Sequence, residues 1–276
     1  MKFIRETFSY LKKSFWLLVL ICLVPAGVLG IFVKPLSSMT FVPQYSKTFV
    51  RSFADVFALI FNVKNLRTVY PLILIFVTIL IAICMCVSVI EKHFRVGKLM
   101  LKKPFSEINS TFFPVLSVEL TLSAVMIVYS ILLISLVSFL QYMICGFGTY
   151  PTVGAVIAAA VISIVLFIVG FCTAGPFMLM IPIMVIYGYS FSDALTSAFE
   201  LAGKKSASVL FGGIFPFLVV LIIEYILSFF EIIKVVSVIV STLMYLFLLV
   251  YIVAYVMIVM FELSGLERRD NKKFHR

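Results

Sequence analysis

Six long runs of apolar residues, separated by short polar segments, dominate the pattern of the chain. A helix rises 1.5 Å per residue, so about 20 mainly apolar residues cross a hydrocarbon core that is about 30 Å thick. Helices also pair the backbone polar groups that lipid cannot satisfy. The pattern predicts a single integral membrane domain over residues 1–276, an all-α polytopic bundle with spans at about 14–32, 70–90, 113–141, 153–187, 209–230 and 235–261.

The fourth run is longer than one straight crossing requires, and it contains Gly170, Gly175, Pro176 and Pro182. Proline removes a backbone donor and clashes with the preceding turn. We therefore expect a kinked helix whose last turns run obliquely toward the membrane surface. Counts of five or seven spans are the alternatives to six.

Three polar connections carry helical signals of their own. In the first, apolar residues recur at helical spacing and predict an amphipathic segment over 49–62, either at the outer membrane surface, re-entrant, or packed as a lid on the spans. On the opposite side, short helices are expected over 91–112 and 192–203. Gly203 stands where the C-terminal cap of a helix from Asp193 to Ala202 should be.

The two larger connections on that side contain similar sequences, Pro-Phe-Ser-Glu-Ile at 104–108 and Ser-Phe-Ser-Asp-Ala at 190–194, each opening a short helical stretch before the next span. A serine can cap the first backbone N–H groups of a helix, and an acid just after it interacts favourably with the helix dipole. This sequence similarity indicates either an internal parallel repeat, with its axis along the membrane normal, or capping chemistry alone.

Composition excludes a soluble globular domain. Of the 276 residues, 63% are hydrophobic and 12% charged, about half the charged fraction of soluble proteins. The odd set of five cysteines does not form a disulfide framework, and with two distant histidines a zinc site is not expected. We therefore expect no cofactor; the cysteines are Cys22, Cys84, Cys86, Cys145 and Cys172.

The net charge of +10 follows the predicted topology. With the N-terminus inside, 16 of the 22 Lys and Arg residues fall in cytoplasmic segments, as expected because these residues resist translocation. Both termini are predicted to be cytoplasmic. The basic residues flank spans and form no continuous patch, so nucleic acid is not expected as a partner.

Two acids within the predicted spans, Glu119 and Glu224, are the candidate intramembrane polar site. A carboxyl group in hydrocarbon is costly and often functional. The first interpretation is an ion or proton site that faces a central cavity. The alternative is a structural role, in which each acid is protonated, hydrogen-bonded to a neighbouring helix, or close to the headgroups.

Five basic residues after the second span alternate with apolar ones and are candidate contacts for anionic lipid, each contributing about 1 kcal/mol. A simple topology signal explains them equally well. They are Lys92, Arg95, Lys98, Lys102 and Lys103. His93, which follows Glu91 and Lys92 at the inner edge of the second span, is the nearest candidate for acid–base chemistry and is interpreted as part of a solvated boundary cluster. No enzymatic motif is present, so we expect a non-enzymatic protein.

The stretch from Ile181 to Ile186, followed by Phe191 to Lys205, places a proline-containing span end before an Ala-Leu, Ser, Gly-Lys helix. It resembles a group of poorly characterised bacterial six-span proteins that includes the membrane domain of some glycerophosphodiester phosphodiesterases. The resemblance covers chiefly residues 180–215. It implies a fold and a bacterial membrane location, not an activity.

Two functional classes follow from these observations. The first is a non-enzymatic protein of the bacterial cytoplasmic membrane with an accessory, scaffold, envelope or lipid-handling role, whose partners are membrane lipids and other membrane proteins. The alternative is a transporter or channel for a small or lipophilic solute, with Glu119 lining the path. A water-filled cavity that reaches Glu119 would favour transport, whereas a solid core with an exposed apolar groove would favour the first class.

Overall fold

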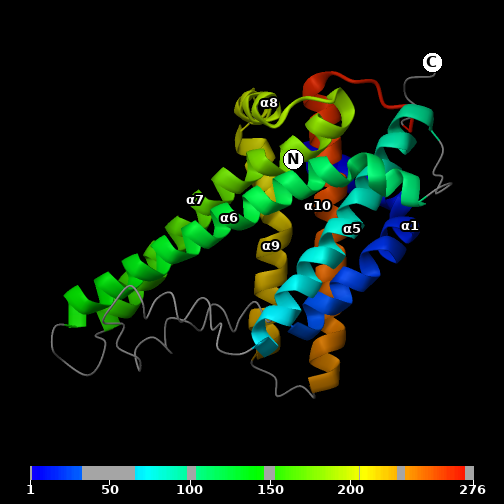
Figure 1. The fold of residues 1–276 in the computed structure, drawn as a ribbon. Coiled ribbons are helices and arrows are strands. Elements are labelled where there is room, and N and C mark those ends of the chain that lie inside the picture. Colours follow the sequence, from blue (N-terminus) through cyan, green and yellow to red (C-terminus); the bar gives the residue numbers. More distant parts are fainter. Residues whose placement is uncertain are drawn as a thin grey trace.

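The computed structural model describes residues 2–32, 66–97, 104–145, 153–204, 206–228 and 234–270. Within these ranges the chain is helical and contains no strand, so the predicted all-α class is confirmed (Figure 1). The helices are α1 (Lys2–Phe32), α5 (Leu66–Val96), α6 (Pro104–Cys145), α7 (Val153–Tyr187), α8 (Phe191–Lys204), α9 (Ser206–Ser228) and α10 (Lys234–Ser264).

Several of these helices have the length and composition of membrane spans. Four qualify singly within the described residues: Lys2–Phe32, Tyr70–Val96, Ile108–Tyr129 and Val238–Ser264. A fifth candidate is the bent pair Gly175–Tyr187 and Phe191–Gly203, whose axes differ by 119°. The described part of the chain therefore provides four or five segments that are long and apolar enough to cross a membrane. The predicted outer segment 49–62 lies outside the described residues.

The core forms around the antiparallel helices α1 and α10, which make the most extensive contact in the described structure. At one end Lys2 contacts Glu262, and near the other Gly30 contacts Thr242. A Cβ atom at Gly30 would overlap the Thr242 side chain and lie 2.9 Å from its backbone nitrogen. Gly30 therefore permits a close helix crossing, and α5 packs against both helices.

Two tyrosines of α10 connect it to α9 at a proline. Pro216 lies inside α9 and cannot donate the hydrogen bond that the carbonyl of Gly212 would otherwise accept. The Tyr251 hydroxyl donates to that carbonyl at 3.2 Å, and the Tyr255 hydroxyl donates to the Val209 carbonyl at 2.8 Å. In lipid, where an unpaired carbonyl is costly, α10 thus compensates for the proline in α9.

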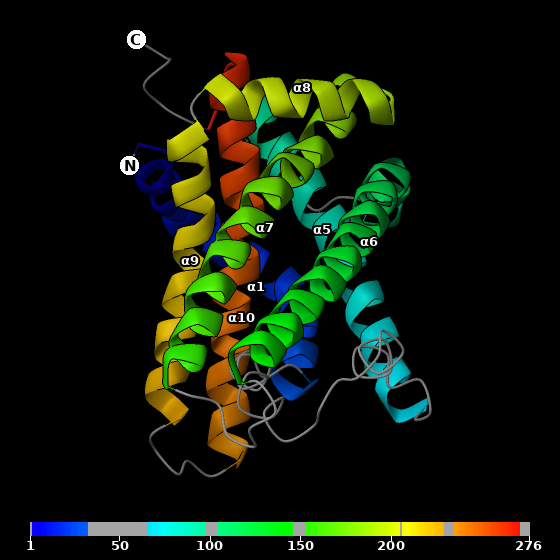
Figure 2. The same ribbon diagram turned by 90° about the vertical axis from the view of Figure 1, so that its left-hand side faces the viewer.

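Helices α6 and α7 pack along each other, and α6 contacts α5 on its other side (Figure 2). α7 continues as one helix past Pro176 and Pro182 to Tyr187. The abrupt change of direction comes later, at Gly188, whose φ of +66° and N–H bond to the Met184 carbonyl form a left-handed C-terminal cap. The 119° change of direction thus follows the end of α7, and the kink expected at Pro176 and Pro182 stays a prediction.

Helix α8 confirms the predicted helix over 192–203. Its N-terminus is capped by Ser190: the Asp193 N–H donates to the Ser190 hydroxyl oxygen at 3.4 Å, and that hydroxyl donates to the Asp193 carboxylate at 2.6 Å. The predicted cap at Gly203 is wrong, because the helix continues to Lys204 and Gly203 has no positive φ.

The short helix expected over 91–112 is not a separate element in the described residues. α5 continues to Val96 and ends at Gly97, whose φ is +76° and whose N–H donates to the His93 carbonyl at 2.9 Å. α6 begins at Pro104, and proline suits the first helical position because its missing N–H would be unpaired there. The predicted short helix is therefore the end of one long helix and the start of the next.

Candidate functional site

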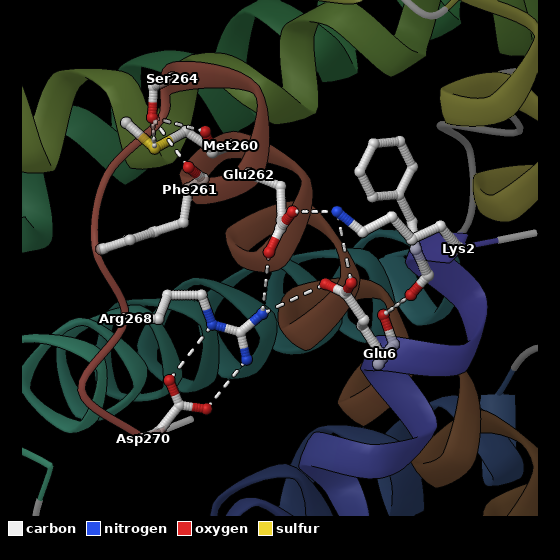
Figure 3. Close-up of polar contacts among 10 residues, drawn as sticks. Lys2, Glu6, Met260, Phe261, Glu262, Ser264, Arg268 and Asp270 are labelled. Carbon is white, nitrogen blue, oxygen red and sulfur yellow. Dashed lines mark hydrogen bonds and ion pairs between the residues drawn. The ribbon is translucent and has the colours of Figure 1, made fainter. Parts of the chain in front are cut away.

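Both ends of the described chain meet on one face of the bundle, which we call the terminal face and define by Lys2, α8 and Asp270 (Figures 1 and 2). Arg268 is the centre of an ionic cluster there (Figure 3). Its guanidinium lies 2.9 Å from the Asp270 carboxylate, 3.5 Å from that of Glu6 and 4.0 Å from that of Glu262. Lys2 completes the cluster with a 2.7 Å bond to Glu262.

An aromatic group supports this cluster from below. The guanidinium of Arg268 lies 4.5 Å above the ring centroid of Phe94, a cation–π geometry. Phe94 in turn contacts Tyr10 and Phe261 edge-on, at centroid distances of 5.1 and 4.9 Å. The backbone N–H of Arg269 donates to the Phe94 carbonyl at 2.8 Å, in the last turn of α5 where carbonyls lack a helical partner.

This ionic cluster and the Phe94 ring therefore connect the start of α1 with the ends of α5 and α10. Arg268 is only 5% exposed although it is a cation, so its attraction to the surrounding carboxylates is screened weakly. We call Lys2, Glu6, Phe94, Glu262, Arg268 and Asp270 the terminal clamp. The sequence holds one signal for this clamp, the i, i+4 spacing of Lys2 and Glu6, whereas Arg268 is one of the 16 basic residues assigned to cytoplasmic segments.

The interpretation of His93 as part of a solvated boundary cluster is wrong. His93 is 7% exposed, and its Nδ1 lies 3.1 Å from the Tyr10 hydroxyl. It points into the α1–α5 contact, because α5 reaches beyond the predicted span end and buries this face against α1. The histidine thus belongs to the packing beneath the terminal clamp.

Glu119 lies in α6, half-buried, with one carboxylate oxygen inaccessible and without a hydrogen-bond partner. Val115, one turn earlier on the same helix face, packs with Leu80 and Cys84 of α5. Thr111, a further turn back, donates to the Cys84 carbonyl at 3.3 Å. Glu119 therefore follows the face of α6 that contacts α5. The side chain of Glu224 lies outside what the structure describes.

Of the five basic candidates, the structure describes two. Lys92 is exposed. Arg95 pairs with Glu91 at 3.1 Å and donates to the Ile186 carbonyl at 3.4 Å, so it joins the last turns of α5 and α7. Arg95 is therefore partly engaged within the protein. Lys98, Lys102 and Lys103 lie outside the described residues.

Cys22, Cys84 and Cys86 are buried free thiols, and the side chains of Cys145 and Cys172 lie outside what the structure describes. Cys22 of α1 and Cys86 of α5 have their Sγ atoms 3.6 Å apart. No group of three or more His, Cys, Asp or Glu side chains that could hold a metal ion occurs within the described ranges. The two thiols act in the structure as small packing groups between α1 and α5.

Two hollows differ sharply in character. One, between α7, α9 and α10, is lined by residues such as Gly175, Gly213 and Tyr255 and has a volume of about 20 Å³, enough for about one water molecule. The other is an open groove of about 620 Å³ at the terminal face, between α1 and α9. We call it the α1–α9 groove; its lining residues are Lys2, Ile4, Arg5, Phe211 and Phe215. Neither hollow reaches Glu119.

Comparisons of this chain with protein-family models, with curated proteins and with solved structures find no match. The fold defines a class, a helical protein with several helices that are long and apolar enough to span a membrane. The resemblance over residues 180–215 stays a prediction from the sequence.

Proposed function

We propose that this chain is a non-enzymatic protein of a bacterial cytoplasmic membrane, with six spans and both termini in the cytoplasm, that serves an accessory role in envelope or lipid handling. In this arrangement the terminal face is the cytoplasmic face, and α7 and α9 add to the spans recognised in the described residues. The loop-charge bias supports this orientation.

One observation carries the proposal: the described core is filled, while an apolar groove with two cations lies open at the terminal face. The residues at the α1–α5–α10 contact are almost fully buried, and the hollow described next to them holds about one water molecule. The groove, in contrast, falls in the volume range of small-molecule sites, about 300–1,000 Å³. This contrast supports surface binding of an amphiphile over passage through the bundle.

Transport is the second candidate, and Glu119 is the observation that favours it. An intramembrane carboxylate oxygen without a hydrogen-bond partner is expensive to keep and typical of ion and proton pathways. If Glu119 carries protons, vesicles containing the full chain should dissipate a pH gradient, and Glu119→Gln should stop this flux. Unchanged flux in the Gln variant would remove Glu119 from the pathway.

The proposed function is tested by the lipids that accompany the protein. We expect membrane discs extracted directly from cells with a styrene–maleic acid polymer to be enriched in anionic phospholipid relative to the whole membrane, as measured by mass spectrometry. Discs around an unrelated six-span protein from the same cells give the baseline. If the lipid composition equals that baseline and vesicles show proton or solute flux, the proposed lipid-handling function is wrong and transport is supported.

A further inference from the structure

We propose that the α1–α9 groove is a specific site for one anionic phospholipid, whose phosphate binds Arg5 and whose acyl chain lies along Phe211 and Phe215. This inference rests on the proposed function, since it names the ligand of the groove that supports it. It concerns different residues from the basic segment that contains Lys92 and Arg95.

The groove is built by the packing below it. Phe8 of α1 lies 5.5 Å from the Tyr251 ring, and the Tyr251 hydroxyl holds the Gly212 carbonyl of α9. α1 and α9 therefore meet through α10, and the first turn of α1 stands beside the first turns of α9 (Figure 2). The groove lies between these two ends of the helices.

Each wall presents one kind of chemistry. On α9, Phe211 and Phe215 are one turn apart and share a face, and Phe211 is 50% exposed. On α1, Lys2 and Arg5 are exposed, and Ile4 lies between them. Cations beside aromatic and aliphatic surface match an amphiphile that has an anionic head and an apolar tail.

The two cations differ in the ion pairs that they already form within the protein. Lys2 already pairs with Glu262 at 2.7 Å and with Glu6 at 3.6 Å. Arg5 makes no ion pair within the described part of the chain and presents a planar guanidinium, which can bind two phosphate oxygens at once. Arg5 is therefore the headgroup ligand in this proposal, and Lys2 belongs to the clamp.

Charge also selects this occupant over others. A second copy of the chain would bring the same Lys2 and Arg5 toward this groove, and like charges would repel. An anionic phospholipid supplies the missing negative charge at the depth where the apolar helices end. The volume of about 620 Å³ accommodates the headgroup region and the start of an acyl chain, with the remaining chain in the bilayer.

The single tryptophan of the chain makes a site-specific experiment possible. Trp16 lies on α1, is 81% exposed and does not line the groove, so its fluorescence reports on general lipid contact. A Trp16→Phe, Phe211→Trp chain instead reports from the groove. The full chain is placed in discs containing brominated phosphatidylglycerol or brominated phosphatidylcholine, both of which quench tryptophan on contact.

We expect the groove reporter to prefer phosphatidylglycerol over phosphatidylcholine by about fivefold in relative binding constant. Adding Arg5→Gln should remove this preference, and Arg5→Lys should keep part of it because the charge remains. Lys12→Gln is the matched control, an exposed cation on the same helix outside the groove, and should leave the preference intact. Trp16 in the natural sequence should show little preference.

Equal quenching of the groove reporter by both lipids, or an unchanged preference in Arg5→Gln, overturns the site. A third outcome would assign the groove to a second copy of the chain. In that case neither lipid quenches the groove reporter, the protein has a dimer mass in mild detergent, and Arg5→Gln abolishes the dimer. If native discs are enriched in anionic lipid but the groove reporter shows no preference, the groove is not the lipid site, while the proposed function is supported. If the native discs are not enriched, the proposed function fails.

Discussion

Helices α10 and α6 are both apolar enough to span a membrane, yet they are packed very differently. In the most apolar window of α10, 67% of the residues are buried inside the protein, whereas the corresponding share in α6 is 18%. α10 contacts α1, α5, α7 and α9, while the substantial described contacts of α6 are with α5 and α7. Most residues in this window of α6 are therefore not buried within the described part of the protein.

This difference shows that hydropathy does not set burial in a membrane protein. α5 has a more apolar window than α10, but a smaller share of it is buried. Lipid tails are as apolar as a protein core, so greasy side chains gain little by leaving them. What distinguishes α10 is its specific contacts: Thr242 against Gly30, the Tyr251 and Tyr255 hydroxyls on α9, and Glu262 in the terminal clamp.

The largest expected effect comes from removing the buried cation of the clamp. Arg268→Ala leaves the carboxylates of Glu6, Glu262 and Asp270 without their shared partner, and we expect it to lower the free energy of unfolding by about 3–5 kcal/mol. The measurement is loss of ellipticity during denaturation in mixed detergent micelles. Arg269→Ala, on the exposed neighbour, should cost less than about 0.5 kcal/mol. Equal losses in both variants would contradict the clamp.

The helix crossing of α1 and α10 gives the next largest effect. Gly30→Leu forces a side chain into the backbone of Thr242, and overpacking of this kind costs about 1–3 kcal/mol. Gly27→Leu is the control on the same helix, because a Cβ atom there meets nothing within 4 Å. The same denaturation assay should separate the two leucine variants. If both behave alike, the close crossing does not hold the core together.

The smallest effect is expected in α6. Glu119→Gln keeps the shape of a half-buried side chain and removes a carboxylate whose buried oxygen has no hydrogen-bond partner. We expect its free energy of unfolding to stay within about 0.5 kcal/mol of the natural chain. Glu6→Gln, the same change within the clamp, should cost about 1 kcal/mol because Glu6 forms ion pairs with Arg268 at 3.5 Å and with Lys2 at 3.6 Å. A larger loss at Glu119 than at Glu6 would reverse the comparison between the two regions.

Local signals in the sequence predicted the helices well. The all-α class and the short helix over 192–203 follow from apolar period and capping residues, which act over a few positions. The details of capping were less predictable. Ser190 caps α8, although Ser192 carries the same hydroxyl, because the Asp193 N–H and side chain both reach Ser190.

The candidate site depends on contacts that no local pattern reveals. Glu119 is recognisable from sequence as a lone acid in a span, but whether its oxygen finds a partner depends on α5. Arg268 meets Glu6 and Phe94 only after three helices have assembled, and its sequence neighbours are those of an ordinary basic tail. The groove likewise exists because Tyr251 sets the distance between α1 and α9.

The bond between Lys2 and Glu262 also constrains how the protein is made, because these residues are 260 positions apart. Synthesis proceeds at about 5–20 residues per second, so α1 waits in the membrane for tens of seconds before α10 leaves the ribosome. During that interval the face of α1 that will meet α10, including Gly30, lacks its permanent neighbour. The contacts of Gly30 with Thr242 and of Lys2 with Glu262 therefore form only at the end of synthesis, and a chain released before Arg268 would lack the centre of the terminal clamp.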